Sequence, residues 1–159
     1  MKELYLIRHA KSGWDHPHLN DFDRPLDDRG LREAPKMAKL FGRRWKAPDL
    51  LISSPAIRAY HTSQFFRSEW TLPWNRYQLH EAIYEATATT LLKVLRELPA
   101  SAERVALVGH NPGISLLVNK LSGADIELKT ACIAHLHTEG DRFEPGDFTL
   151  QDLHSPKMY

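Results

Sequence analysis

The stretch Leu4-Tyr5-Leu6-Ile7-Arg8-His9-Ala10-Lys11-Ser12 decides the fold of this chain and the place of its functional site. Its first four residues are apolar and include a β-branched and an aromatic side chain, which predicts a strand buried on both faces. The polarity changes abruptly at Arg8 and His9. In an open α/β sheet the ligand crevice lies beyond the carboxyl ends of the strands, so these two residues stand where a ligand is expected.

The chemistry of this pair predicts an anion site. An arginine can donate two parallel hydrogen bonds to a phosphate or carboxylate, and a histidine is largely neutral and nucleophilic near pH 7. Arg8 and His9 together therefore indicate a phosphate site that contains a nucleophile. Considered alone, the dipeptide is more typical of a surface ion pair beside a loop histidine, so the hypothesis depends on residues further along the chain.

Composition limits the class of protein. At 159 residues the chain is expected to form one domain over residues 1–159 with an ordinary hydrophobic core. The formal net charge of +1, from 21 basic and 20 acidic residues, argues against nucleic acid or a membrane as partner. The single cysteine, Cys132, excludes an internal disulfide and is expected to be a small buried hydrophobe. No run is long enough for a signal sequence or a membrane span, so we expect a cytoplasmic protein.

Apolar runs and helical periods alternate along the rest of the chain. Further strands are expected at about 49–53, 76–79, 104–108, 131–137 and 148–153, and helices at about 28–45, 57–68, 87–98 and 112–121. This alternation predicts an α/β fold, a three-layer sandwich in which helices cover both faces of a mainly parallel central sheet.

Several local expectations come from residues that interrupt these patterns. Pro35 lies inside the first helix and is expected to kink or split it. Residues 13–26 are rich in turn formers and are expected to form a long ordered loop that walls the site. The segment 131–137 alternates as a partly exposed edge strand does. A serine at position 53 or 54 is expected to cap the helix that follows the second strand.

Two further strand ends carry residues suited to the same site. Arg58 lies near the start of the helix that follows the second strand, and on its own it is typical of a solvated helix arginine. His110 follows the strand at 104–108, as His9 follows the first strand. Since the carboxyl ends of parallel strands lie along one edge of a sheet, we expect Arg58 and His110 to lie close to His9.

Two groups of histidines carry donor atoms for a metal. His16 and His18 lie near aspartates in the loop, but their spacing around a proline matches no common ligand pattern. His135 and His137 would share one face of a strand, yet no third ligand is apparent. We therefore expect no metal site.

Three segments of the chain resemble those of the histidine phosphatase superfamily, also called the phosphoglycerate mutase-like fold. They are Arg8-His9-Ala10-Lys11-Ser12, Ser53-Ser54-Pro55-Ala56-Ile57-Arg58-Ala59 and Val108-Gly109-His110-Asn111-Pro112-Gly113, in matching order and spacing. More narrowly, Lys11-Ser12, Asp21-Phe22-Asp23-Arg24-Pro25-Leu26 and Asn111-Pro112-Gly113 are similar to the SixA-type phosphohistidine phosphatases. The resemblance extends from the first strand to about Gly123.

The resemblance implies a role for each of the four site residues. His9 matches the nucleophile that accepts the phosphoryl group, forming a phosphohistidine that water then hydrolyses. Arg8, Arg58 and His110 match the groups that surround the phosphate. Phosphoryl transfer needs in-line positioning and positive charge, so we expect the two arginines and a protonated His110 to balance the dianion while His9 is neutral. No metal or other cofactor is implied.

The sequence offers more than one candidate for the general acid. Asn111 stands where the acid phosphatase branch of the superfamily has an aspartate, and an amide cannot donate a proton as a carboxylic acid can. The segment from Leu79 to Tyr84 is similar to that of the mutase-like branch, in which a glutamate serves, so Glu81 is the candidate. Glu85 or a loop aspartate is the alternative. Phosphohistidine needs less acid assistance than an alkyl phosphate, because its protonated ring is a good leaving group.

The length of the chain bears on its substrate. Larger superfamily members insert a cap between the third and fourth strands, whereas here we expect no large cap insertion and a shallow, open pocket. Such a pocket suits a phosphorylated side chain on another protein, and the SixA-type resemblance implies protein phosphohistidine. Lys11, Arg24 and Arg29 would supply a basic rim. A phosphatase of small phosphoesters and a phosphate-binding module with little turnover are the alternatives, and an uncapped site disfavours mutase activity.

Overall fold

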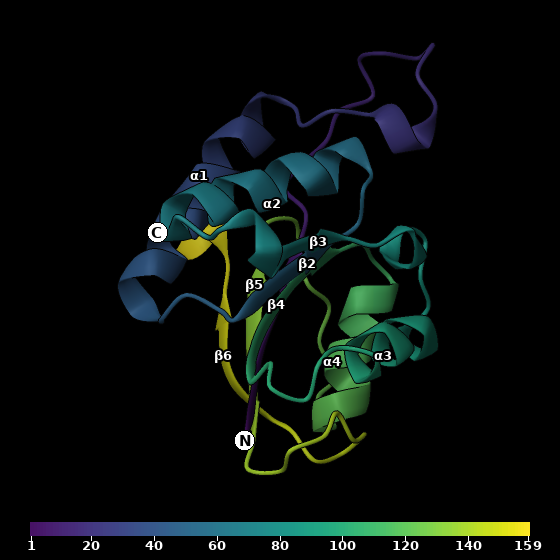
Figure 1. The fold of residues 1–159 in the computed structure, drawn as a ribbon. Coiled ribbons are helices and arrows are strands. Elements are labelled where there is room, and N and C mark those ends of the chain that lie inside the picture. Colours follow the sequence, from purple (N-terminus) through teal and green to yellow (C-terminus); the bar gives the residue numbers. More distant parts are fainter.

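In the computed structural model, which describes residues 1–159, six strands form one sheet in the order β3-β2-β4-β1-β5-β6 (Figure 1). The strands are β1 (Lys2–Arg8), β2 (Leu50–Ser53), β3 (Tyr77–Leu79), β4 (Arg104–Gly109), β5 (Ile133–Thr138) and β6 (Thr149–His154). The helices are α1 (Asp28–Arg44), α2 (Ile57–Trp70), α3 (Ala88–Arg96) and α4 (Gly113–Ser122). β1 to β4 are parallel to one another, and β5 is antiparallel to both of its neighbours. None of the helices has the length and apolar composition that a membrane span requires.

The sheet is covered on both faces because its central strand is apolar on both. Leu4 and Leu6 belong to the core that α3 and α4 form against one face. Tyr5 and Ile7 belong to the core that α1 and α2 form against the other face (Figure 1). All four side chains are fully buried. The predicted three-layer α/β fold with a mainly parallel sheet is confirmed.

The connection between β3 and β4 is short. It holds one 3-10 turn, η3 (Glu81–Ile83), and the helix α3. The expectation that no large cap is inserted here is therefore correct (Figure 1).

The first helix differs in one respect from expectation. Asp27 caps α1, since its side chain accepts a hydrogen bond of 2.8 Å from the backbone N–H of Gly30. Pro35 does not split the helix, which continues to Arg44. The carbonyl of Leu31 loses its donor to the proline, but Leu31 is exposed and water can satisfy it. The buried face of α1 packs against the sheet on both sides of Pro35, which keeps the helix continuous.

The prediction that residues 131–137 form an edge strand was wrong. β5 pairs with β1 on one side and with β6 on the other, so β6 is the edge. The alternation arises because His135 and His137 are polar yet half-buried, and both bind the carboxylate of Glu3 on β1. Cys132, just before β5, is buried in the core as expected.

Gly113, the first residue of α4, permits a close approach that any side chain would prevent. A Cβ atom here would lie 2.1 Å from the carbonyl oxygen of Ala86, which is backbone and cannot swing away. We expect Gly113→Ala to lower the free energy of unfolding by about 1–3 kcal/mol in urea denaturation. Gly140→Ala is the control, because its Cβ would meet only the Thr138 hydroxyl, at 3.5 Å. Equal stability of the two variants would contradict this assignment.

Candidate active site

The candidate site lies at the carboxyl ends of three neighbouring strands. Arg8 ends β1 and His9 follows it, Ser54 follows β2, and His110 follows β4. Two backbone hydrogen bonds of 3.1 Å hold these ends together, from His9 to Gly109 and from Ser54 to the carbonyl of Val108 on β4. The rings of His9 and His110 consequently lie 5.0 Å apart between centroids. The structure thus brings together the residues that the sequence placed at one edge.

Arg8, His9 and His110 line one cavity of about 260 Å³. The ten residues that line it are Arg8, His9, Lys11, Ser12, Trp14, Arg24, Arg58, His110, Asn111 and Thr130. Four of them are arginine or lysine and none is a carboxylic acid. The cavity is therefore suited to an anion, and Lys11 and Arg24 take the rim positions that were predicted for them. Arg29 does not line it, because its guanidinium is paired with Glu33 on the exposed side of α1.

His9 is held as a neutral imidazole with one defined tautomer. Its Nδ1 lies 2.7 Å from the carbonyl oxygen of Ala10, and since a carbonyl can only accept, Nδ1 carries the proton. The lone pair then resides on Nε2. Burial first, and then the nearby imidazole of His110 and the charge of Arg58, lower the pKa of His9 to about 3. The ring is therefore neutral over the whole physiological pH range, and its Nε2 lone pair is free for nucleophilic attack.

His110 is also neutral, contrary to the expectation that it is protonated. Burial first, and then the charge of Arg58, lower the pKa of His110 to about 4. Its Nε2 lies 2.7 Å from the hydroxyl of Ser54, whereas its buried Nδ1 has no partner. A serine hydroxyl that donates to Nε2 leaves the ring proton on Nδ1. A neutral His110 therefore still offers an N–H donor to an anion.

Ser54 has a different role from the helix cap that was predicted. Its hydroxyl accepts from the backbone N–H of Ala56 at 3.2 Å and contacts His110, while α2 begins at Ile57 without a side-chain cap. The serine is fully buried between the two strand ends. Because Ser54 lies against His110, its hydroxyl contacts the histidine ring and does not cap α2.

The two arginines are each anchored by hydrogen bonds to the protein, and each keeps one buried guanidinium nitrogen unpaired. Arg8 donates from Nη1 to the carbonyl of Leu128 at 3.1 Å. Arg58 donates to the carbonyl and to the carboxylate of Asp21, at 2.7 and 3.0 Å. The Nε atom of each guanidinium is buried without a partner. Unpaired buried donors are costly, and three of them (with Nδ1 of His110) belong to residues that line one cavity.

Asp21 organises the loop that walls the site. Its carboxylate accepts from Arg24, Arg58 and Tyr84, with the tyrosine hydroxyl at 2.7 Å. Burial raises the pKa of Asp21, but the hydrogen bonds from Tyr84 and Arg58 outweigh it and lower the pKa to about 2. Asp21 is therefore an ionised anchor at neutral pH and not a proton donor. The loop prediction holds, since residues 13–26 are irregular apart from an isolated bridge at the last of them and the short turn η1 (Asp21–Asp23).

Glu81, the predicted general acid, is not among the residues that line the cavity. It begins η3 as an exposed residue whose side chain makes no hydrogen bond or ion pair. Tyr84, three residues later, stands edge-on to His110 with ring centroids 5.6 Å apart. Glu81 thus lies outside the cavity lining, and its role stays a prediction.

The histidines weighed as metal ligands lie elsewhere. His16 and His18 are exposed in the loop, and His135 and His137 are bound to the Glu3 carboxylate. No group of three or more His, Cys, Asp or Glu side chains is arranged to hold a metal ion.

The sequence did not single out Ser12, Trp14 and Thr130 as site residues. Ser12 accepts a 2.8 Å hydrogen bond from Arg24, and Trp14 stacks on the same guanidinium. Their position directly after His9 was the available signal. Thr130 is far from the other segments in sequence and joins the site only because the chain turns back into β5.

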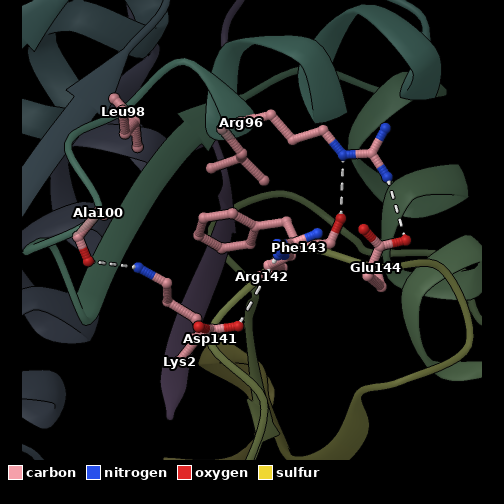
Figure 2. Close-up of a pocket in the computed structure, with 9 residues that line it drawn as sticks. Lys2, Arg96, Leu98, Ala100, Asp141, Arg142, Phe143 and Glu144 are labelled. Atoms are coloured by element: carbon pink, nitrogen blue, oxygen red, sulfur yellow. Dashed lines mark hydrogen bonds and ion pairs between the residues drawn. The ribbon is translucent and has the colours of Figure 1, made fainter.

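A second cavity of about 360 Å³ lies at the opposite end of the sheet, where β1 begins (Figure 2). Here the Lys2 ammonium donates to the Ala100 carbonyl at 3.1 Å. Arg96 donates to the Phe143 carbonyl at 3.2 Å and pairs with Glu144 at 3.6 Å. Because these charged groups satisfy one another and the backbone, we place the functional site at the histidine cavity.

Known proteins resemble this chain in sequence and in fold. Residues 4–89 match the model of the histidine phosphatase superfamily (branch 1). An uncharacterized chloroplastic protein of Arabidopsis thaliana is 30% identical, over 98% of this chain and 78% of its own length. A putative phosphohistidine phosphatase SixA from Agrobacterium tumefaciens is similar in structure, with a TM-score of 0.84, 29% identity and 98% of both chains covered. A protein histidine phosphatase SixA in complex with tungstate has the same fold, with a TM-score of 0.84, 21% identity and 98% of both chains covered.

The charge states of the site histidines can be measured by NMR titration of the imidazole nitrogens. We expect His9 and His110 to stay neutral from pH 8 to pH 5, with the His9 proton on Nδ1. His137 is the internal control, because its hydrogen bonds with Glu139 and then Glu3 raise its pKa above the usual value. The unfolded chain protonates both site histidines below about pH 6.5, so stability should fall as the pH is lowered from 7 to 5. A His9 that titrates near pH 6.5 would contradict the burial argument.

Proposed function

This chain belongs to the histidine phosphatase superfamily, and we propose that it is a phosphatase that removes the phosphoryl group from phosphohistidine side chains of other proteins. The observation that carries the proposal is the hydrogen bond from His9 Nδ1 to the carbonyl of Ala10. It leaves the lone pair of Nε2 free in a cavity lined by four cationic side chains. A nucleophile and a phosphate site then coincide.

The proposed reaction has two steps. The Nε2 lone pair of His9 attacks phosphorus in line with the substrate's P–N bond, which breaks and returns its electron pair to the protonated ring of the leaving histidine. Water then attacks the phosphohistidine on His9, the new P–N bond breaks, and inorganic phosphate leaves. The second step restores His9 to the neutral tautomer in which it began.

The surroundings of His9 supply the donors that this transfer requires. The unpaired Nε atoms of Arg8 and Arg58 and the unpaired Nδ1 of His110 are buried in residues that line the cavity. A phosphoryl group would give all three an acceptor, and charge-assisted hydrogen bonds of this kind are strong in a buried site. Preorganised donors lower the barrier because they need no rearrangement as charge develops.

Phosphohistidine is favoured over phosphate esters by the absence of a carboxylic acid from the cavity lining. An alkoxide must be protonated as it leaves, whereas the ring of phosphohistidine already carries a proton and leaves as a neutral imidazole without a second one. The short β3–β4 connection also leaves the cavity open to a side chain displayed on a protein. The similarity to a structure described as a putative phosphohistidine phosphatase supports the same substrate.

Substitution of the nucleophile is the direct test. We expect His9→Ala to lower kcat/KM by at least about a thousandfold on a phosphohistidine-bearing protein and on small phosphoesters. EDTA should leave the wild-type rate unchanged, because the proposed steps use side chains alone. The wild-type protein should favour the phosphoprotein, and rapidly quenched single turnovers should trap the phosphoryl group on His9.

His18→Ala is the matched control, since His18 is an exposed loop histidine outside the cavity. It should retain full activity. Turnover that persists in His9→Ala would remove His9 from the mechanism. Phosphate binding by the wild-type protein without turnover of any substrate would instead favour a phosphate-binding module.

Glu81 is proposed as proton donor only for poor leaving groups. Its side chain is exposed and makes no hydrogen bond or ion pair, so its carboxyl is free to donate a proton. We expect Glu81→Gln to lower kcat/KM at least about tenfold on an alkyl phosphate and to change it less than about threefold on a phosphoramidate. Unchanged rates on both substrates would exclude Glu81 from the mechanism.

A further inference from the structure

Trp14 is the most exposed large apolar side chain of the protein, at 71%. It is also the one hydrophobic residue among the ten that line the histidine cavity. An exposed tryptophan at the mouth of an otherwise polar, cationic cavity has no role in packing the core. Its exposed ring is available to whatever enters.

The ring of Trp14 rests on a rigid support. The guanidinium of Arg24 lies 3.7 Å from the ring centroid, which is close stacking. Arg24 is buried and is fixed by hydrogen bonds to the carboxylate of Asp21, the hydroxyl of Ser12 and the carbonyl of Gly13. One face of the indole is therefore covered by a fixed guanidinium, while the residue as a whole remains exposed.

We propose that Trp14 is an aromatic platform at the cavity mouth, which binds the imidazole ring of the phosphorylated residue as the phosphoryl group enters the cavity. The proposal rests on the proposed function and specifies its substrate class as phosphoryl groups carried on a flat aromatic or heteroaromatic ring. A phosphoserine-like aliphatic carrier has no π face to place on the indole and gains nothing from it.

The platform acts mainly on substrate binding. The ring of phosphohistidine is cationic while it carries both its proton and the phosphoryl group, and the returning P–N electron pair makes it neutral. A ring with cationic character over an indole face is attracted by the indole quadrupole. Loss of the platform should therefore raise KM more than it lowers kcat.

The chain contains its own control for this inference. Trp74 is also exposed, at 63%, and also stacks on a guanidinium, that of Arg67 at 3.9 Å. Trp74 belongs to the turn before β3 and does not line the histidine cavity. The two tryptophans therefore share their exposure and their cation contact, and differ in whether a substrate can reach them.

The experiment compares substrates that differ only in the ring. The rates of hydrolysis of 1-phosphoimidazole and of phosphoramidate, which has no ring, are measured for the wild-type protein and for Trp14→Leu, Trp14→Phe and Trp74→Leu. We expect Trp14→Leu to lower kcat/KM about fivefold to tenfold on phosphoimidazole and less than twofold on phosphoramidate. Trp14→Phe should recover most of the loss, and Trp74→Leu should behave as the wild type.

Each other result is decisive. Equal losses on both substrates would mean that Trp14 only supports Arg24, and this would overturn the platform. If the wild-type protein hydrolyses phosphoramidate but not phosphoimidazole, the phosphohistidine proposal fails, and phenyl phosphate against methyl phosphate then tests the platform separately. A ring preference that Trp14→Leu abolishes on phenyl phosphate would retain the platform, and its absence there would overturn it.

Discussion

The imidazole of His9 is held by one hydrogen bond, from its Nδ1 to the carbonyl oxygen of Ala10, and the chemistry of the site depends on that bond. A carbonyl cannot donate, so the proton must stay on Nδ1 and the lone pair on Nε2. The bond forms because β1 ends at Arg8 and the chain turns at once into the loop. A backbone hydrogen bond from His9 to Gly109 keeps that turn beside the end of β4. The orientation of the nucleophile is thus a consequence of where two buried strands end.

Burial determines which side chains of this site carry a charge. An imidazole that is taken out of water loses its proton readily, whereas a guanidinium keeps its charge. Burial lowers the pKa values of His9 and His110 well below neutrality, and the nearby arginines add to the effect. The result is a cavity with neutral imidazoles and permanent cations. Asp21 compensates Arg24 and Arg58 at the wall, which limits repulsion among the cations while their remaining donors stay available.

Much of the fold was predictable because its signals are local. A continuous apolar run predicted β1, and the alternation of apolar runs with helical periods predicted the other elements. The errors have a common cause, which is that side chains found partners from distant segments. His135 and His137 alternate as edge residues do, yet they are half-buried because Glu3 on the neighbouring strand binds them. Serine is a residue type that commonly caps helices, but Ser54 contacts His110. Pro35 weakens α1 locally, and packing against the sheet keeps the helix whole.

The sequence by itself determined the fold class and four residues of the site, because apolar periodicity places the strands and parallel strands end at one edge. It also carried the motifs of the superfamily. Only the tertiary structure decided that His110 is neutral, that Asp21 anchors Arg58, and that Glu81 does not line the cavity. It likewise decided that Trp14 stands at the cavity mouth. These properties depend on burial and on contacts between segments far apart in the chain, and no local pattern encodes either.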